Sequence, residues 1–397
     1  MSLERTFIPY GAYWSTPFCK WQGRLAGEHS MKLAAGVVRS AAGEGRLRPE
    51  RLDGIVLGTT VMQRQSFYGA PWLAGMIGAD RLTGPTISQA CATSAAIVAS
   101  AALQIEAGQR ECVLAIACDR TSNGPHVYYP DPSGPGALGK AENPVWDNFN
   151  RDPFAGNAMI ETAENVAREA GITREEQDAM ALLRSEQYQA ALADDRAFQK
   201  RYMMPVVLNA GKKNEQVVDR DEGVFGTTAE GLARLKPVQE GGTVTFGTQT
   251  YPADGNAGVV LCTREAAARL AIRSGVTVQV LGFGSARAKK GFMPMAVVPA
   301  ARQALDAAGV AIADCAVVKT HNPFAVNDVY LCRELALEPA KVNRYGSPLV
   351  YGHPQAPTGL RAMVELIEEL VERGGGLGLF TGCAAGDTAM AVVFRVG

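Results

Sequence analysis

The chain has 397 residues, and its 39 basic and 40 acidic side chains give a formal net charge of −1. This balance excludes the strongly basic class of nucleic-acid-binding proteins, and it excludes binding to anionic membranes through net charge alone. Globular domains usually contain about 100–200 residues, so the length predicts about two or three core-forming units.

No apolar run of about 18 residues occurs, so no membrane-spanning helix is expected. The opening sequence, M-S-L-E-R-T-F-I-P-Y-G, lacks the features of a signal peptide, and a cytoplasmic location is expected. The eight cysteines include no C-x-x-C pair, which predicts free thiols and no zinc motif.

Short β-branched runs alternate with alanine-rich segments along the chain. In chain order, we predict a helix at 31–42, a strand at 52–57, a helix at 93–107, strands at 113–117, 258–261 and 276–281, a helix at 298–308, a strand at 316–318, a helix at 359–373, and strands at 377–381 and 388–394. This alternation predicts an α/β fold with sheets that are largely covered by helices.

The two ends of the chain resemble each other. In each, a helix precedes a strand that begins near an aspartate, Asp53 or Asp314, and a candidate catalytic residue follows at nearly the same spacing. Repetition of this kind is common in α/β proteins, but the matched spacing favours a duplicated core. Between the ends, the turn-rich segment 122–157, two predicted helices at 157–170 and 174–193, and a polar stretch indicate an excursion that covers a site.

Cys91 lies in S-Q-A-C-A-T-S at 88–94, directly before a predicted helix of small residues. A helix N-terminus favours an anion, so we expect it to lower the thiol pKa and supply a thiolate for acyl transfer. Main-chain N–H groups at the same turn are candidate oxyanion donors. A buried, inert cysteine fits the same residues, and this alternative stays open.

Two histidines occupy similar places in the second half of the chain. His353, in Y-G-H-P just before a predicted helix, is expected to be neutral and to act as a base towards a thiol. His321 follows directly on a buried strand, where α/β folds place their sites. A loop histidine without function is the alternative for His353. His29 and His126 are interpreted as structural or surface residues.

Cys383 lies in a tight turn, T-G-C-A-A-G-D at 381–387, between two apolar strands. Glycines of this kind let main-chain amides approach a ligand closely, which a packed core cysteine does not need. The other cysteines considered are expected in the core: Cys112, Cys118, Cys262, Cys315 and Cys332.

Several segments together resemble the thiolases along nearly the whole chain. The sequence N-R-Y-G-S-P-L-V-Y-G-H-P at 343–354 resembles the family's N-x-x-G-G-x-x-x-x-G-H-P segment, and G-C-A-A-G at 382–386 resembles its C-x-G-x-G turn. The sequences L-K-P at 235–237, G-T-V-T at 242–245 and D-G at 254–255 are similar to the end of the family's loop domain.

The resemblance implies the thiolase fold, an α/β fold with a duplicated five-layered αβαβα core and an inserted loop domain. The implied units are an N-terminal half at 1–120 and 246–270, a loop domain at 121–245 that covers the coenzyme A site, and a C-terminal half at 271–397.

The resemblance also implies an acyltransferase that cleaves a 3-ketoacyl-CoA, or forms one by Claisen condensation. Coenzyme A would be the co-substrate, with no covalently bound cofactor and no metal. Cys91 is then the acylated nucleophile, His353 its activating base, and Cys383 the acid and base for the carbon nucleophile. The main-chain N–H groups of Cys91 and Ala385 would form the oxyanion hole.

Some residues depart from the common pattern. His321 stands where most thiolases carry the asparagine of an N-E-A-F box, as in sterol-carrier-type thiolases, and would bind the thioester oxygen. Ala385 replaces a glycine of the C-terminal turn. The opening I-P-Y-G-A-Y-W at 8–14 resembles bacterial thiolase-like subunits that pair with a small zinc-ribbon/OB-fold protein. Some of these act on aromatic or branched esters such as benzoylsuccinyl-CoA.

For coenzyme A, Thr250 falls where the family has a serine near the pantetheine, and Lys212, Lys213 and Arg220 are expected to meet the phosphates. Solvated surface charge is the alternative for these last three residues. Thiolases are usually dimers or tetramers, so a homo-oligomer is expected.

Two other functions fit part of the pattern. A ketoacyl-synthase-type condensing enzyme shares the nucleophile and two histidines but lacks a second active-site cysteine, so Cys383 favours a thiolase. A non-catalytic, acyl-CoA-binding thiolase-like subunit would not need all four reactive side chains.

Overall fold

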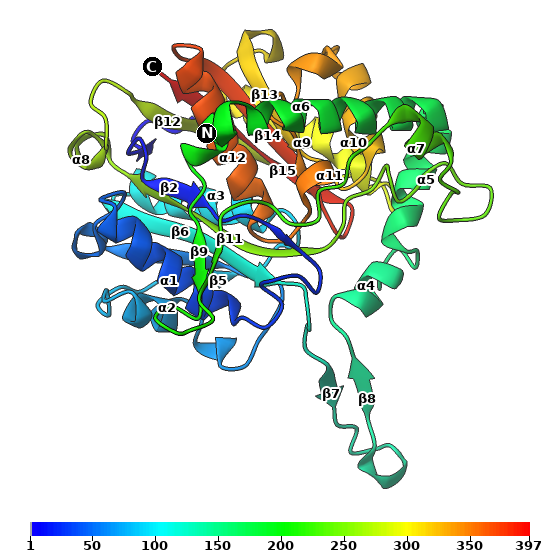
Figure 1. The fold of residues 1–397 in the computed structure, drawn as a ribbon, viewed down its shortest axis with the longest axis horizontal. Coiled ribbons are helices and arrows are strands. Elements are labelled where there is room, and N and C mark those ends of the chain that lie inside the picture. The colour runs from blue at the N-terminus through cyan, green and yellow to red at the C-terminus, as the bar shows by residue number, and fades with distance from the viewer. Residues whose placement is uncertain (1) are drawn as a thin grey trace.

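The computed structural model describes residues 2–397, and its main sheet runs through two α/β halves (Figure 1). The first half contains β4 (Gly54–Gly58), β5 (Thr86–Ile87), β6 (Cys112–Arg120) and β11 (Ala253–Cys262). The second half contains β12 (Val278–Arg287), β13 (Cys315–His321), β14 (Gly376–Ala384) and β15 (Thr388–Val396). Between them, β1 (Phe7–Ile8) pairs with both β11 and β12 and joins the halves. Two short strands, β2 (Tyr13–Ser15) and β3 (Cys19–Lys20), also pair with β11.

The two halves pair their strands in the same way. β4 is parallel to β6, and β6 is antiparallel to β11; likewise β13 is parallel to β14, and β14 is antiparallel to β15. The strands β6 and β11 are buried almost throughout, because helices cover both faces of the sheet. This explains why residues 112–118 of β6 and 257–262 of β11 are apolar or glycine throughout and do not alternate with polar residues.

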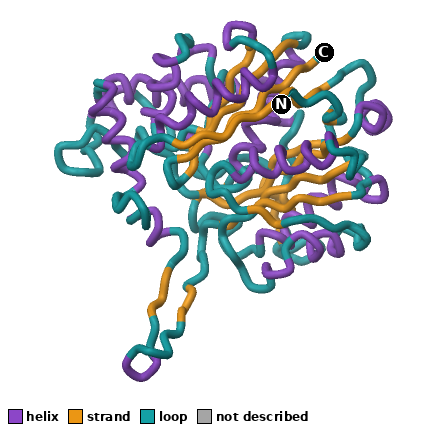
Figure 2. The backbone as a smooth tube through the Cα atoms, turned by 180° about the vertical axis from the view of Figure 1, so that it is seen from behind, coloured by secondary structure: helices purple, strands orange, loops and turns teal. Residues whose placement is uncertain are grey.

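Helices lie between the two halves of the main sheet and on the outer face of each half, so that helices and strands form five layers (Figure 2). α1 (Ser30–Gly43) and α2 (Ala70–Met76) pack on the outer face of the first half, and α9 (Val297–Ala308) and α10 (Ala325–Glu334) pack on the outer face of the second. α3 (Thr93–Glu106) and α12 (Thr358–Glu372) share one core cluster with the inner faces of both sheets. The predicted αβαβα order is therefore confirmed. Two further short helices are α8 (Arg264–Leu270) and α11 (Pro348–Tyr351).

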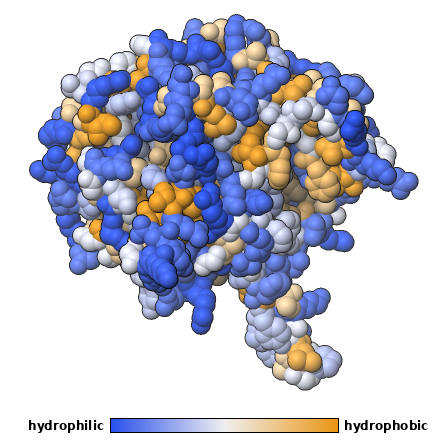
Figure 3. All heavy atoms as spheres, in the orientation of Figure 1, coloured by the Kyte–Doolittle hydropathy of each residue, from blue (hydrophilic) through white to orange (hydrophobic). Residues whose placement is uncertain are grey.

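The predicted excursion leaves the core after β6 and returns at β11. It contains β7 (Val127–Tyr129), β8 (Lys140–Glu142), α4 (Trp146–Asn150), α5 (Met159–Ala170), α6 (Arg174–Lys200), β9 (Val206–Leu208), β10 (Gln216–Val218) and α7 (Ala229–Ala233). The hairpin β7–β8 projects from the body of the molecule as an arm (Figures 1 and 3). The backbone of α6 leaves helical geometry at 193–196, which is where the predicted helix ends. The unit boundaries given above remain a prediction.

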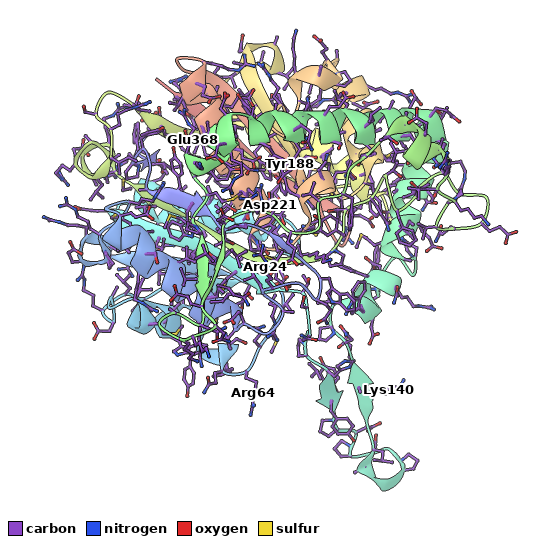
Figure 4. All side chains as sticks on the ribbon, in the orientation of Figure 1. Arg24, Arg64, Lys140, Tyr188, Asp221 and Glu368 are labelled. Carbon is purple, nitrogen blue, oxygen red and sulfur yellow. The ribbon has the colours of Figure 1, made fainter. Side chains whose placement is uncertain are left out.

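Buried ion pairs fix the excursion to the second half. Arg184 of α6 lies 2.7 Å from Asp328 of α10, and Arg361 of α12 lies 2.7 Å from Asp221, with all four side chains fully buried. Tyr188 also donates to Asp221, and Figure 4 shows these two residues where the excursion meets the core. Removing one partner of such a pair leaves an uncompensated buried charge and costs about 3–5 kcal/mol. The excursion is therefore held in one position on the core.

All eight cysteines are free thiols. Cys112, Cys118, Cys262 and Cys332 are buried as predicted, but the prediction for Cys315 is wrong, because it opens β13 and is partly exposed. Within residues 2–397, no helix is both long and apolar enough to cross a membrane.

Candidate active site

The N-termini of the two central helices meet, and their approach brings the candidate catalytic residues together. A Cβ added to Gly359, near the start of α12, would lie 2.9 Å from the Cβ of Ser94 in α3, so only glycine permits this contact. The Ser94 hydroxyl donates to the carbonyl of Ala356 and ties the two loops together. Cys91 and His353, which precede α3 and α12, consequently face each other.

A short, strained turn presents Cys91 at the start of α3. Ala90 has a φ of +44°, a left-handed conformation that is unfavourable for a residue other than glycine. Thr93 holds this turn, because its hydroxyl donates to the Ala90 carbonyl at 2.7 Å and accepts from the Gln89 N–H at 2.9 Å. The turn leaves Cys91 largely buried, with 7% of the residue exposed.

The nucleophile and its predicted base are in contact. His353 Nε2 lies 3.2 Å from Cys91 Sγ, and His353 Nδ1 lies 2.7 Å from the hydroxyl of Thr358. When Nδ1–H donates to the Thr358 oxygen, Nε2 carries a lone pair and can accept the proton of the Cys91 thiol. This is the geometry that an activated cysteine nucleophile needs.

The resting form of Cys91 differs from the prediction. Burial raises the pKa of the Cys91 thiol to about 12, and Asp119 adds to the rise, whereas hydrogen bonds from the main-chain N–H groups of Ala385 and Cys91 oppose it. The expected thiolate stabilised by the helix N-terminus is therefore wrong, because loss of solvent outweighs the helix. Burial first, and His321 second, lower the pKa of His353 well below its usual value, so the imidazole is neutral, as predicted.

His321 joins this pair from the end of β13. Its ring centre lies 4.2 Å from that of His353 with an interplanar angle of 33°, and it is fully buried. Burial lowers the pKa of His321 to about 3, so this imidazole is also neutral. Neither ring nitrogen has a hydrogen-bond partner among residues 2–397. Gly382 lies opposite in β14, where a Cβ would come within 2.8 Å of His321 Cβ.

Cys383 completes the predicted group from the end of β14. Asn327 Nδ2 donates to its sulfur at 3.2 Å. Burial, followed by the charge of a neighbouring Cys91 thiolate, raises the pKa of Cys383 well above its ordinary value. Cys383 is therefore a thiol near neutral pH, with a proton to donate and an amide N–H to stabilise the sulfur once the proton has left.

Several supporting residues were not predicted. Asp119, at the carboxyl end of β6, accepts hydrogen bonds from the main-chain N–H groups of Thr60, Val61 and Ala356 at 2.9–3.0 Å. It thereby ties the loop after β4 to the turn that carries His353. An acidic residue ending a buried strand was the available sequence signal. Asn327 was missed because it acts through Cys383, which is distant in sequence. Thr358 lies only five residues after His353, but the sequence does not show that the two side chains bond to each other.

Gln355 is a further residue that the sequence analysis missed. Its backbone has a φ of +65°, and its Oε1 accepts from the Cys91 thiol at 3.4 Å. Asn322, at the glutamate position of the family's box, points elsewhere: its amide donates to Asp328 and Ser347 and accepts from the N–H of Leu349. Asn322 therefore holds the loop beneath His321.

The residues predicted to contact coenzyme A lie in three separate places. The Thr250 hydroxyl donates to the carbonyl of Pro348 at 2.6 Å, beside the loop that leads to His353. Arg220 lines a cavity of about 410 Å³ together with Arg196 and Phe225. The exposed Lys212 and Lys213 lie in the turn of the β9–β10 hairpin. That hairpin packs into the outer core of the first half with α1, so the structure does not group these two lysines with the reactive side chains.

Comparison with known proteins identifies the family. Residues 12–265 match the thiolase N-terminal domain and residues 275–396 match the thiolase C-terminal domain. The beta-ketoadipyl-CoA thiolase of Pseudomonas knackmussii is 31% identical over 380 residues, covering 93% of this chain and 94% of the relative. The acetyl-CoA acetyltransferase of Syntrophomonas wolfei is 30% identical, covering 98% and 99%.

Solved structures agree with this assignment. The crystal structure of a Bacillus anthracis acetyl-CoA acetyltransferase superposes with a TM-score of 0.91 at 28% identity, covering all of both chains. Human mitochondrial 3-ketoacyl-CoA thiolase, solved in complex with CoA, gives a TM-score of 0.90 at 26% identity over 100% of this chain and 99% of that one. The chain therefore belongs to the thiolase family of acyltransferases.

Proposed function

We propose that this thiolase cleaves a 3-ketoacyl-CoA, or forms one in the reverse direction, through an acyl group carried on Cys91. The contact of 3.2 Å between Cys91 Sγ and His353 Nε2 is the observation that carries the proposal, because it joins a buried thiol to a neutral base. Cys383 supports the proposal as the second thiol, because Cys91 contributes to the raised pKa of Cys383 after burial.

In the cleavage direction, His353 accepts the thiol proton as Cys91 attacks the ketone carbon of the substrate. The main-chain N–H groups of Cys91 and Ala385 then stabilise the resulting oxyanion. The bond between the α and β carbons breaks, its electron pair remains on the departing acetyl-CoA enolate, and Cys383 donates the proton. A second coenzyme A thiol gives its proton to a base of the site and takes the acyl group from Cys91, which restores the enzyme.

His321 supplies a neutral imidazole for the thioester oxygen. Because neither of its ring nitrogens bonds to another residue within 2–397, its N–H is free to donate to the oxygen that gains charge in the enolate. A neutral donor serves here without placing a fixed positive charge beside His353.

Coenzyme A is proposed as the co-substrate, with no covalently bound cofactor. The human relative solved with CoA supports this assignment. Thr250, which lies beside the loop that leads to His353, is the proposed contact for the pantetheine. Arg220, whose side chain is 65% exposed, is the proposed phosphate contact at the wall of the 410 Å³ cavity. Lys212 and Lys213 remain proposed phosphate contacts on the strength of their charge alone.

A branched or aromatic acyl group, such as that of benzoylsuccinyl-CoA, is the proposed finer specificity. This proposal rests on the resemblance of residues 8–14 to thiolase-like subunits that act on such esters. Within this segment, Tyr13 and Trp14 are core residues with no exposed surface. The name of the Pseudomonas relative suggests a dicarboxylic substrate as the competitor. Comparing kcat/KM for acetoacetyl-CoA, 3-oxoadipyl-CoA and benzoylsuccinyl-CoA decides between them.

A homodimer or tetramer is proposed for the assembly, and a small zinc-ribbon/OB-fold protein is the proposed additional partner. A groove of about 750 Å³ along α3, lined by Ala99, Leu103 and Met390 among others, offers an apolar face. The arm exposes Tyr128 and Leu138. Light scattering on the full chain, alone and coexpressed with such a partner, measures the assembly.

Separate measurements of acylation and turnover test the catalytic roles. Cys91→Ala should abolish both, because no sulfur remains to carry the acyl group. Cys383→Ala should still form an acyl-enzyme, detectable by mass spectrometry, but should lose C–C bond formation and cleavage by about 100-fold or more, because general acid–base catalysis contributes about that much. Cys332→Ala, a buried cysteine elsewhere in the core, is the matched control and should retain both steps. Loss of acylation in Cys383→Ala would show that its role is assigned wrongly.

A further inference from the structure

The side chains of Cys91, His321 and His353 form a compact set of soft and borderline metal ligands. One potential ligand atom from each residue lies within 4.8 Å of the other two, and the Cys91 and His353 atoms are 3.2 Å apart. The three residues come from three different loops and strands, so no short sequence spacing indicates the cluster. Thiolate sulfur and imidazole nitrogen are both ordinary ligands of zinc in proteins.

His321 makes the cluster unlike an ordinary cysteine–histidine pair. It is 0% exposed, yet neither ring nitrogen bonds to another residue within the described chain, 2–397. A buried imidazole normally has a partner, because an unsatisfied polar group costs about 1–3 kcal/mol. Its ring lies against that of His353, and one of its nitrogens lies within 4.8 Å of potential ligand atoms of Cys91 and His353.

The geometry suits a tetrahedral ion. Zinc bonds of about 2.0–2.1 Å to nitrogen and about 2.3 Å to sulfur place the ligand atoms about 3.3–3.6 Å apart. The contact between Cys91 and His353 is already close to this value. The remaining separations, which are at most 4.8 Å, require the His321 ring to shift by up to about 1.5 Å and to turn, because the ion must lie in the planes of both imidazoles. Cys91 is 7% exposed and His353 is 5% exposed, so the cluster keeps some contact with solvent, from which an ion and a fourth ligand such as water would come.

We propose that Cys91, His321 and His353 bind a thiophilic divalent cation such as Zn²⁺, and that the bound ion blocks acylation of Cys91. Binding forms a bond from the Cys91 sulfur to the metal and releases the thiol proton to solvent, while each imidazole contributes a nitrogen lone pair. The ion therefore occupies the lone pair with which the sulfur would attack a thioester. The inhibitory part of this inference rests on the proposed function, whereas metal binding itself does not.

Titration of the full-length, chelator-treated enzyme with Co²⁺, without any acyl-CoA, tests metal binding directly. We expect a sulfur-to-cobalt charge-transfer band at one equivalent, displaced by Zn²⁺. Cys91→Ala should lose the band, and His321→Asn, which keeps an amide donor but removes a ligand, should weaken Zn²⁺ binding at least about 10-fold. His126→Asn, which removes an exposed histidine, is the matched control and should bind as the wild type does.

A second measurement follows the rate at which iodoacetamide alkylates Cys91. One equivalent of Zn²⁺ should slow this rate in the wild type, and far less in His321→Asn. Equal Zn²⁺ affinity in wild type and His321→Asn, or no charge-transfer band at all, would overturn the inference. Metal binding without turnover of any 3-ketoacyl-CoA would instead count against the proposed function alone, and turnover without metal binding against this inference alone.

Discussion

At the scale of single residues, the chemistry depends on which atom holds each proton. Cys91 is a thiol at rest, because burial raises its pKa to about 12. In the proposed reaction, its proton therefore moves to His353 during the attack. His353 can accept that proton at Nε2 only when Nδ1 carries the other one. The hydroxyl of Thr358, 2.7 Å from Nδ1, is the group that holds the ring in this form.

Thr358 is therefore a positioning residue. Thr358→Val keeps the shape of the side chain but removes the acceptor, so we expect kcat for 3-ketoacyl-CoA cleavage to fall on the order of 10- to 100-fold, with little change in KM. Thr358→Ser should restore most of the rate, because it restores the oxygen. A purely structural role would instead predict similar loss of stability in both variants and no selective rescue of kcat.

At the scale of elements, the four reactive side chains stand where strands end and central helices begin. β13 ends at His321 and β14 ends just after Cys383, and the two strands are parallel neighbours in register. Gly382 faces His321 across this pairing. The absence of a side chain at position 382 leaves the room that the Cβ and ring of His321 occupy.

Gly382→Ala should therefore disturb both stability and catalysis. The added Cβ would meet His321 Cβ at 2.8 Å and Phe380 at 3.1 Å, an overpacking that typically costs about 1–3 kcal/mol. We expect a lower midpoint in urea unfolding and a lower kcat. Gly27→Ala is the control, because its Cβ would meet nothing within 4 Å, and it should change stability by less than about 0.5 kcal/mol. Equal effects of the two substitutions would contradict this account of the His321 position.

At the scale of the whole molecule, folding buries two neutral imidazoles in the layer between the two halves. Burial lowers the pKa of His321 to about 3, and burial together with His321 lowers that of His353. An unfolded histidine has a pKa of about 6.5, so the unfolded chain binds more protons than the folded one between about pH 3 and about pH 6.5. Stability from these groups is complete above about pH 6.5 and is lost as the pH falls.

The free energy of unfolding should accordingly decrease on acidification below about pH 6.5, with each histidine contributing up to about 1.4 kcal/mol per pH unit. His321→Asn should flatten this slope, because asparagine does not titrate there. Urea unfolding at several pH values measures it, with the exposed His126→Asn as the control. A slope in His321→Asn equal to that of the wild type would show that His321 is not buried in neutral form.

Much of the fold and part of the site followed from the sequence. The helix predicted at 359–373 is α12 (Thr358–Glu372) and the strand predicted at 113–117 lies within β6, because alternating apolar strands and small-residue helices report local structure directly. The candidate catalytic residues were recognisable because the motifs around them are turns at the ends of such elements; these residues are Cys91, His321, His353 and Cys383. The orientation of Asn327 and the contacts of Asp119 were not recognisable, since their partners lie far away in the chain.

The sequence by itself determined the fold class, the order of elements and the four residues that carry reactive groups. Only the tertiary structure decided their protonation, because a pKa depends on how far folding removes each group from water. The same burial reversed the expectation for Cys91, left the nitrogens of His321 without a partner within 2–397, and brought three metal ligands from separate segments within reach of one another. Local sequence specifies the elements; the desolvation and contacts that set the chemistry arise only when the two halves close on each other.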